Sequence, residues 1–236
     1  MIDFTPWAQM LRTYVSQGQV DYARWQKESA TTLDQWLASL QTVELSALEA
    51  GGNRESAIAA WINLYNAVVV QQVLKRYPIR SIRPEILGIP NWASFLLFFK
   101  QPVFAVGDRT LSLDNIEQDT LRAQYDESRI HFALVCASTG CPLLRSEAYT
   151  PTLLSDQLEG DARRFINNST KVNYDPASNT LYCSKIFKWY QDDFLSQAES
   201  IPAYIQPYLA ETIIQANANI VYLPYSWQLN DQRTFS

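Results

Sequence analysis

The chain has 236 residues, of which 47% are apolar and 13% aromatic, a composition that supports a sizeable hydrophobic core and excludes a disordered chain. Its formal charge of -5 at pH 7 provides no basic surface for nucleic acid. Only 7 glycines are present, and neither G-x-x-x-x-G-K nor G-x-G-x-x-G occurs, which excludes a glycine-rich nucleotide cradle.

The sequence also predicts a compartment. No segment approaches the roughly 18 continuous apolar residues that a membrane span requires, so we expect no span. The first residues, MIDFTP, lack the basic and then apolar layout of a signal peptide. Together with the odd number of cysteines, 3, this start predicts a protein of the reducing cytoplasm.

Helical patterns dominate the first third of the chain. Thr5 and Pro6 predict a helix start, with Thr5 as the N-cap and Pro6 at the first helical position. Apolar residues then recur at spacings of three and four until Gly18, which indicates one buried helix face. A second amphipathic helix is expected at 31–40.

The most strongly helical segment is 53–76, where Asn53 is the predicted N-cap. Two amides, Asn63 and Asn66, lie in its apolar middle. Buried polar groups are normally hydrogen-bonded, so we expect these amides to hold the backbone of a neighbouring loop.

Shorter elements follow. The segment 80–101 contains prolines and lacks a period, which predicts an irregular connection. Helices are expected at 112–124, 152–167, 188–194 and 201–217, and strands at 102–106 and 110–112 (a hairpin), 130–136, 180–183 and 219–225. Without repeats or flexible linkers, residues 1–236 are predicted to form a single α+β domain. It is helix-rich around a small, largely antiparallel sheet, with a helical N-terminal part at about 1–50.

Candidate chemistry is concentrated in the segment 129–142, which holds the only histidine, His131, and two cysteines, Cys136 and Cys141. A thiol becomes a useful nucleophile when its pKa is lowered or a base takes its proton, and imidazole is the usual base near neutral pH. Three cysteines and one histidine would also supply the four ligands that a structural zinc ion needs. Their spacing does not resemble a zinc-ligand pattern, so no metal and no cofactor is expected.

Several blocks resemble, in order, the domain of unknown function 547 family, which is found in bacteria, plants and animals. These blocks are AWINLYNA at 60–67, LDNIE at 113–117, the segment 131–142, SKIFKWYQDDF at 184–194 and VYLPYSWQLN at 221–230. The resemblance covers about 50–230. It implies a fold similar to papain-like and transglutaminase-like thiol enzymes, with a cysteine, a histidine and an acid in the active site.

Carried onto this chain, the resemblance implies His131 as the histidine, Cys136 or Cys141 as the cysteine, and Glu117 as the acid. The cysteine thiolate would attack a carbonyl carbon, His131 would move the proton, and Glu117 would orient the imidazole. Backbone amides at 138–140 would stabilise the oxyanion. The predicted function is therefore cysteine-dependent acyl transfer by a peptidase, deamidase or transglutaminase-like enzyme acting on a peptide or small-molecule substrate. Cys183 is interpreted as buried core.

Spacing opposes the simplest version of this site. In a straight strand of about 3.3 Å per residue, His131 and Cys136 would lie roughly 16 Å apart on opposite faces, whereas a nucleophile and its base must meet near 3 Å. A turn at 137–140 would return Cys141 along the chain, closer to Cys136 than to His131. The histidine also precedes the cysteines, the reverse of the usual papain-like order. Which cysteine acts stays open.

Other interpretations remain. Buried, inert thiols are the common case, and Glu117 could simply cap a turn or pair with Arg122. A non-catalytic binding or scaffold module would use its aromatic residues as a partner surface: Trp92, Phe95, Phe98, Phe99, Trp189, Tyr190, Tyr225 and Trp227. Redox chemistry between Cys136 and Cys141 is disfavoured, because the pair lacks the C-x-x-C spacing that lowers a thiol pKa. Substrate and oligomeric state are not encoded in any recognisable pattern.

Overall fold

The computed structural model describes residues 2–43, 53–87, 89–210 and 212–233. Its α-helices are α1 (Thr5–Tyr14), α2 (Tyr22–Ser39), α4 (Arg54–Leu74), α5 (Trp92–Lys100), α6 (Leu154–Ile166), α7 (Ile186–Trp189), α8 (Gln191–Leu195) and α9 (Ile201–Ile205). Three short 3-10 helices are η1 (Leu40–Thr42), η3 (Ser128–Phe132) and η4 (Gln206–Tyr208), and η2 (Asn115–Arg122) is wound as a π-helix. The strands are β1 (Val15–Ser16), β2 (Gln19–Val20), β3 (Glu85–Ile86), β4 (Ile89–Pro90), β5 (Phe104–Val106), β6 (Arg109–Leu111), β7 (Val172–Asp175), β8 (Thr180–Cys183) and β9 (Asn219–Tyr222).

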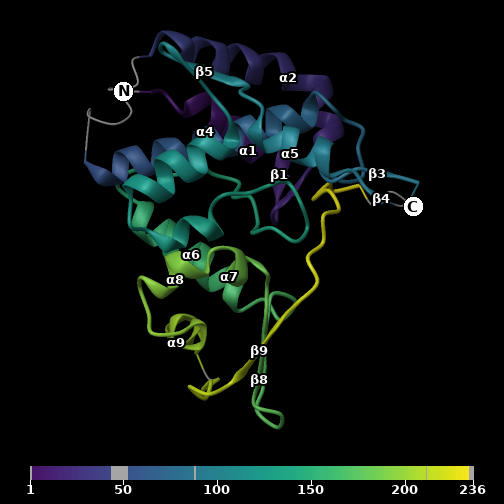
Figure 1. The fold of residues 1–236 in the computed structure, drawn as a ribbon. Coiled ribbons are helices and arrows are strands. Elements are labelled where there is room, and N and C mark those ends of the chain that lie inside the picture. Colours follow the sequence, from purple (N-terminus) through teal and green to yellow (C-terminus); the bar gives the residue numbers. More distant parts are fainter. Residues whose placement is uncertain (1, 44–52, 88, 211, 234–236) are drawn as a thin grey trace.

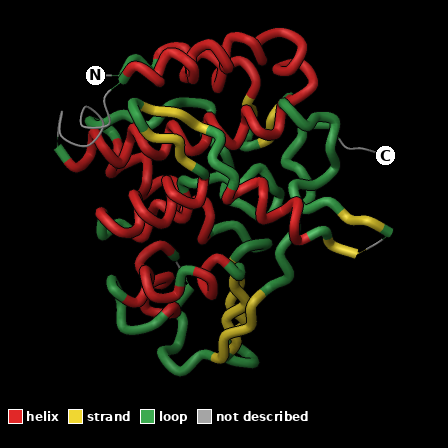
Figure 2. Tube along the Cα trace, turned by 45° about the horizontal axis from the view of Figure 1, so that its top comes forward, coloured by secondary structure: helices red, strands yellow, loops and turns green. Residues whose placement is uncertain are grey.

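The helix-rich α+β class is confirmed, and Figure 2 shows how much of the chain is helical. The strands form four small separate sheets among the described residues, and their pairs are antiparallel except for the parallel pair β8–β9. In Figure 1, β8 and β9 extend away from the helical body. The predicted hairpin is present as β5–β6, and Gly107 in its turn has a φ of 56°.

Two helices at the N-terminus pack through aromatic residues. Trp7 of α1 lies 5.9 Å, centroid to centroid, from Trp25 of α2. The predicted helix start is confirmed to within one residue, since Thr5 is already helical and Phe4 occupies the N-cap. The predicted helix at 31–40 is the second half of the longer α2, and residues 44–50 of the predicted helical N-terminal part lie outside the described residues.

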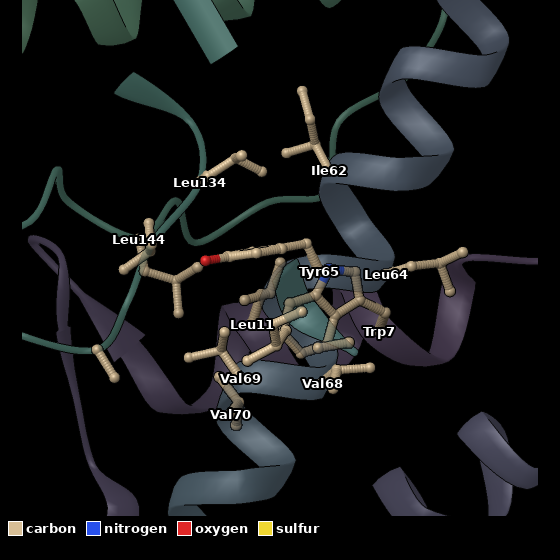
Figure 3. Close-up of a cluster of buried hydrophobic side chains, with 14 of the residues drawn as sticks. Trp7, Leu11, Ile62, Leu64, Tyr65, Val68, Val69, Val70, Leu134 and Leu144 are labelled. Carbon is tan, nitrogen blue, oxygen red and sulfur yellow. The ribbon is translucent and has the colours of Figure 1, made fainter. Parts of the chain in front are cut away.

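Helix α4 is the central core element. Asn53 caps it as predicted, because its side-chain oxygen accepts a hydrogen bond from the Ser56 amide at 3.0 Å. Figure 3 shows Tyr65, Val69 and their neighbours on α4 packed against Trp7, Leu11, Leu134 and Leu144. By length and hydropathy alone α4 could cross a membrane. However, 94% of its most apolar window is buried inside the protein, and a buried core helix is expected to be equally apolar.

The two amides of α4 hold loop backbone, as predicted. Asn63 donates to the Tyr149 carbonyl at 2.8 Å and accepts from the Tyr149 amide at 2.9 Å. Asn66 donates to the Ala133 carbonyl at 2.9 Å and accepts from the Val135 amide at 2.9 Å. Each side chain thus satisfies both backbone groups of a buried loop, and Asn66 fixes the segment that leads to the cysteines.

Three predicted elements are wrong, each for a local reason. Residues 130–136 are not a strand: η3 ends at Phe132, and the backbone beyond it bonds to Asn66 instead of to a ladder. The segment 80–101 is not wholly irregular, because Asn91 caps α5 by accepting from the Ser94 amide at 3.1 Å. The helix expected at 201–217 stops early, since Pro207 lacks an amide hydrogen.

The predicted helix at 112–124 is present, with Ser112 accepting a capping hydrogen bond from the Asn115 amide at 3.0 Å. Its middle, η2, has the wider π winding, in which amides bond five residues back along the chain. The predicted helix at 152–167 is α6, and the helical piece at 188–194 is the pair α7 and α8.

Two hydrophobic clusters fill the interior. The larger one surrounds α1, α2 and α4, and the smaller one surrounds Phe132, Phe187 and Phe194 between α6, α8 and β8. Cys136 packs at the edge of the first cluster, and Tyr190 and Tyr225 pack at the edge of the second. The candidate chemistry therefore lies where the two clusters meet.

We predict that Asn66→Ala lowers the free energy of unfolding by about 2–4 kcal/mol, because it leaves a buried amide and a buried carbonyl without partners. Urea unfolding measures this change. Asn167→Ala, which removes an exposed amide that also bonds to two backbone carbonyls, is the control and should cost less than about 1 kcal/mol. Equal effects of the two substitutions would contradict the assigned role of Asn66.

Candidate functional site

A cavity of about 480 Å³ lies at the junction of the two clusters. All four sequence-predicted site residues line it: Glu117, His131, Cys136 and Cys141. Its wall is largely aromatic, and apart from the buried Phe98, every aromatic residue proposed for a partner surface contributes to it: Trp92, Phe95, Phe99, Trp189, Tyr190, Tyr225 and Trp227. The structure thus gathers the predicted thiols, imidazole and carboxylate around one cavity.

The two cysteines form a disulfide, with their Cα atoms 6.1 Å apart. Ala137, with a φ of 62°, reverses the chain between them, so the predicted turn brings Cys141 back to Cys136. The Cys141 sulfur accepts hydrogen bonds from the Cys136 amide at 2.9 Å and from the Tyr225 hydroxyl at 3.2 Å. The C-x-x-x-x-C spacing, which disfavoured redox chemistry in the sequence, therefore allows the pair to bond.

The two sulfurs differ in their surroundings. Cys141 is 4% exposed, whereas Cys136 is only partly buried. The Cys136 sulfur lies 3.2 Å from the Ser138 hydroxyl oxygen and 3.4 Å from that of Tyr225. Cys136 is consequently the more accessible of the pair. Cys183 is buried, as predicted, and burial raises the pKa of its thiol to about 12.

The turn between the cysteines is fixed from outside. The amide of Thr139 donates to the Gln228 carbonyl at 2.8 Å, and that of Gly140 donates to the Ser226 carbonyl at 2.9 Å. The predicted oxyanion hole at 138–140 is therefore wrong for the amides of Thr139 and Gly140, which are already engaged. Gly140 is required there, because a Cβ atom would lie 2.5 Å from the Ser226 carbonyl oxygen.

Lys171 completes the support of this turn. Its ammonium group donates to the carbonyl oxygens of Thr139 at 2.6 Å and Gly140 at 2.8 Å. Burial lowers the pKa of Lys171 to about 8, since desolvation disfavours its charged form. The cysteine turn is thus clamped on one side by the C-terminal segment and on the other by a partly desolvated lysine.

The imidazole of His131 is held by Asp193, a residue that the sequence interpretation did not select. His131 Nε2 lies 2.6 Å from Asp193 Oδ2, and the ring stacks on Tyr190 with centroids 3.8 Å apart. A further edge contact reaches Phe194 at 5.5 Å. The structure places no sulfur among these contacts of the ring, which is 1% exposed as a side chain. The expected direct pairing of His131 with Glu117 is therefore replaced by pairing with Asp193.

The positive charge of Arg122 holds the carboxylate of Asp193 in place beside His131. Arg122 binds this carboxylate with two hydrogen bonds, Nε to Oδ2 at 2.6 Å and Nη2 to Oδ1 at 2.7 Å. Burial raises the pKa of Asp193, but the hydrogen bonds from Arg122 and then His131 outweigh it and hold that pKa well below its usual range. The pKa of His131 is lowered, because desolvation of the ring outweighs the attraction of Asp193.

Glu117 lies apart from this pair, although it faces the same cavity. The side chain is buried, at 8% exposure, and its Oε2 accepts a hydrogen bond from the Tyr65 hydroxyl at 3.2 Å. Burial, and then the charge of Glu117, raise the pKa of Tyr65 and that of Tyr190 well above their usual value. The alternative pairing of Glu117 with Arg122 is wrong, since the guanidinium binds Asp193.

A sequence signal for Asp193 did exist. The residue lies in the block 184–194, which contributed to the family resemblance, but its neighbour Asp192 is equally acidic and no spacing rule separates them. Tyr225 lies in another such block, at 221–230. Only the fold shows that these downstream residues return to the cysteines and the histidine.

We predict that the free energy of unfolding decreases as the pH is lowered from 7.5 to 5.5. His131 has a lowered pKa in the folded protein, so below the unfolded value of 6.5 the unfolded chain binds a proton that the folded chain does not. Stability from this group is present above that value and is lost as the pH falls toward the folded pKa. Urea unfolding of the wild type and of His131→Gln at pH 7.5 and 5.5 measures this change in the free energy of unfolding.

This test is selective because the chain has only 1 histidine. In His131→Gln the decrease between the two pH values should become markedly smaller, whatever the stability of the variant itself. An unchanged pH dependence in the variant would show that the imidazole is not the responsible group.

Comparison with known proteins completes the description. The sequence pattern of the family described as "Protein of unknown function, DUF547" matches residues 13–166, more than half of the chain. The match includes Glu117, His131 and both bonded cysteines, whereas Asp193 lies beyond it. No curated protein and no solved structure matches the chain significantly. The chain therefore belongs to the family of domains of unknown function 547.

Proposed function

We propose that this cavity is the active site of a cysteine-dependent acyl-transfer enzyme, a peptidase, deamidase or transglutaminase-like enzyme that acts when the disulfide is reduced. One observation carries the proposal: the partly buried Cys136 sulfur and the sole imidazole line the same cavity, and the imidazole is oriented by the carboxylate of Asp193. A nucleophile, a base and a group that orients the base are the parts that this chemistry requires.

Cys136 is the proposed nucleophile, because it is the less buried of the two bonded sulfurs. A dithiol reductant would supply two electrons and two protons and leave two thiols. The Cys136 thiolate then adds to the carbonyl carbon, the bond to the leaving group breaks, and the leaving group takes a proton. Water or an amine removes the acyl group in the second step. In the oxidised protein the Cys136 sulfur lies 3.2 Å from the Ser138 hydroxyl oxygen and 3.4 Å from that of Tyr225.

His131 is the proposed base. With Nε2 engaged by Asp193, Nδ1 is the nitrogen that remains for proton exchange. Asp193 stabilises the imidazolium that forms, and its lowered pKa keeps it ionised. The sulfur does not contact the ring in the oxidised protein, so the proposal requires the Cys136 side chain to turn toward His131 once its bond to Cys141 is broken.

A second candidate function, thiol–disulfide exchange, is favoured by the bond itself. The Cys141 sulfur accepts an amide and a hydroxyl hydrogen bond, which would stabilise it as a leaving thiolate when another thiol attacks Cys136. Thiol–disulfide exchange requires both cysteines but no base at His131. Substitution of Cys141 should therefore abolish exchange only, and substitution of His131 should abolish acyl transfer only.

We predict that iodoacetamide labels Cys136 of the reduced protein rapidly below pH 7, and that His131→Ala slows this labelling at least about tenfold, because the thiol loses the base that accepts its proton. Mass spectrometry of digested samples taken over time gives the rate at each cysteine. Cys183, with its pKa raised to about 12, is the internal control and should label slowly in both proteins.

Cys141→Ser separates the candidates. Acyl transfer predicts that Cys136 in this variant stays rapidly labelled and dependent on His131, whereas exchange predicts that reduction of a disulfide substrate is lost. In the reduced wild-type protein, slow labelling at all three cysteines that His131→Ala leaves unchanged would refute the acyl-transfer proposal.

A further inference from the structure

We infer that the cavity accepts an organic cation, a protonated amine or guanidinium on an apolar stem, whose charge pairs with Glu117. The inference deepens the proposed function, on which it rests for the identity of the site, by naming the chemical class of the substrate group. The structure gives Asp193 the imidazole-orienting role expected of Glu117 and so leaves the second carboxylate without a part in the acyl-transfer steps.

The groups that donate hydrogen bonds to Glu117 are neutral. Its carboxylate accepts from the hydroxyl of Tyr65 at 3.2 Å and from the side-chain amide of Gln118 at 3.4 Å. In the described part of the chain, the guanidinium of Arg122 forms its ion pair with Asp193, and the imidazole of His131 hydrogen-bonds to the same carboxylate. Among the described residues Glu117 thus forms no ion pair of its own, and a ligand cation would supply one.

The other charges on the cavity wall do not provide that cation. Lys100, on α5, lies 3.8 Å from the carboxylate of Asp114, with both side chains well exposed to solvent. The guanidinium of Arg122 is bound on two edges by Asp193. The positive groups on the wall are therefore already matched to other carboxylates, and a ligand cation is the remaining partner for Glu117.

The aromatic wall suits the same ligand. Tyr225 and Trp227 are in contact at 4.5 Å between ring centroids, and Trp189 lies 4.8 Å from Tyr225. Ring faces attract cations, and one protein cation already uses this wall: the Arg83 guanidinium carbon lies 5.7 Å from the Trp227 ring centroid and 5.4 Å from that of Trp92. The wall thus presents both an apolar surface for a stem and π faces for a positive group.

Size and access agree with this assignment. A volume of about 480 Å³ is within the range of small-molecule sites and exceeds one lysine or arginine side chain. The wall residues Trp92 and Trp189 are 54% and 45% exposed, so the cavity opens to solvent. A basic side chain of a peptide could enter there with its acyl group near Cys136. The proposed substrate is therefore an acyl compound that carries a positive charge.

The experiment measures binding to the oxidised protein, in which Cys136 is bonded and no acyl transfer occurs. The probes are 4-phenylbutylamine and its neutral analogue 4-phenylbutan-1-ol. Each is titrated into the protein while tryptophan fluorescence is recorded, a signal to which Trp92, Trp189 and Trp227 contribute from the cavity wall. We expect the amine to bind at least about tenfold more tightly than the alcohol. Glu117→Gln should raise the Kd of the amine by about tenfold or more and change that of the alcohol by less than about twofold.

Asp114→Asn is the matched control, since it removes a carboxylate of the same wall that already pairs with Lys100. The Kd of the amine should stay within about twofold. The comparison of amine with alcohol on the wild type requires no substitution and remains decisive if Glu117→Gln fails to fold.

Equal affinity for the amine and the alcohol, or equal weakening of both by Glu117→Gln, would overturn the inference. The result is independent of the labelling of Cys136. Failure of amine binding with fast, histidine-dependent labelling removes only the substrate class, and slow labelling with selective amine binding removes only the acyl-transfer chemistry.

Discussion

The carboxylate of Asp193 is the constraint on which the site depends. It receives two hydrogen bonds from Arg122 on η2 and one from His131 on η3, and it belongs to α8, so a single side chain joins three elements. Without this negative charge, a guanidinium and an imidazole would face each other at the edge of a largely aromatic interior. The pairing also fixes which imidazole nitrogen is occupied, and thereby determines what chemistry the ring can perform.

Two carboxylates at the site have different surroundings: Glu117 lines the cavity, and Asp193 binds the imidazole of His131. The carboxylate of Asp193 is bound by the guanidinium of Arg122 and the imidazole of His131 and is held ionised, whereas that of Glu117 accepts from the hydroxyl of Tyr65. Such a division commonly separates a structural or orienting acid from one that meets a ligand. It arises here because the chain supplies the two groups from different elements, Glu117 from the family-matched region and Asp193 from beyond it.

Local signals predicted much of the fold. Asn53 and Ser112 were identifiable as caps, and Asn63 and Asn66 as loop-binding amides, because each depends on neighbours in sequence or on the rule that buried amides are bonded. The site was only partly predictable. The cysteine turn follows from the residues between Cys136 and Cys141, but the approach of Asp193 to His131 is a tertiary contact between distant segments. An apolar run after His131 likewise could not reveal that Asn66 would take its backbone hydrogen bonds.

The π winding of η2 determines which side chains face the cavity. In an α-helix of 3.6 residues per turn, positions separated by five residues point about 140° apart, so Glu117 and Arg122 could not both face one side. The wider winding, with hydrogen bonds spanning five residues, brings these two positions into line, and both line the cavity. With α-helical winding and the same sequence, one of these two charges would point away from the other, so the pitch of η2 determines which charged side chains face the cavity.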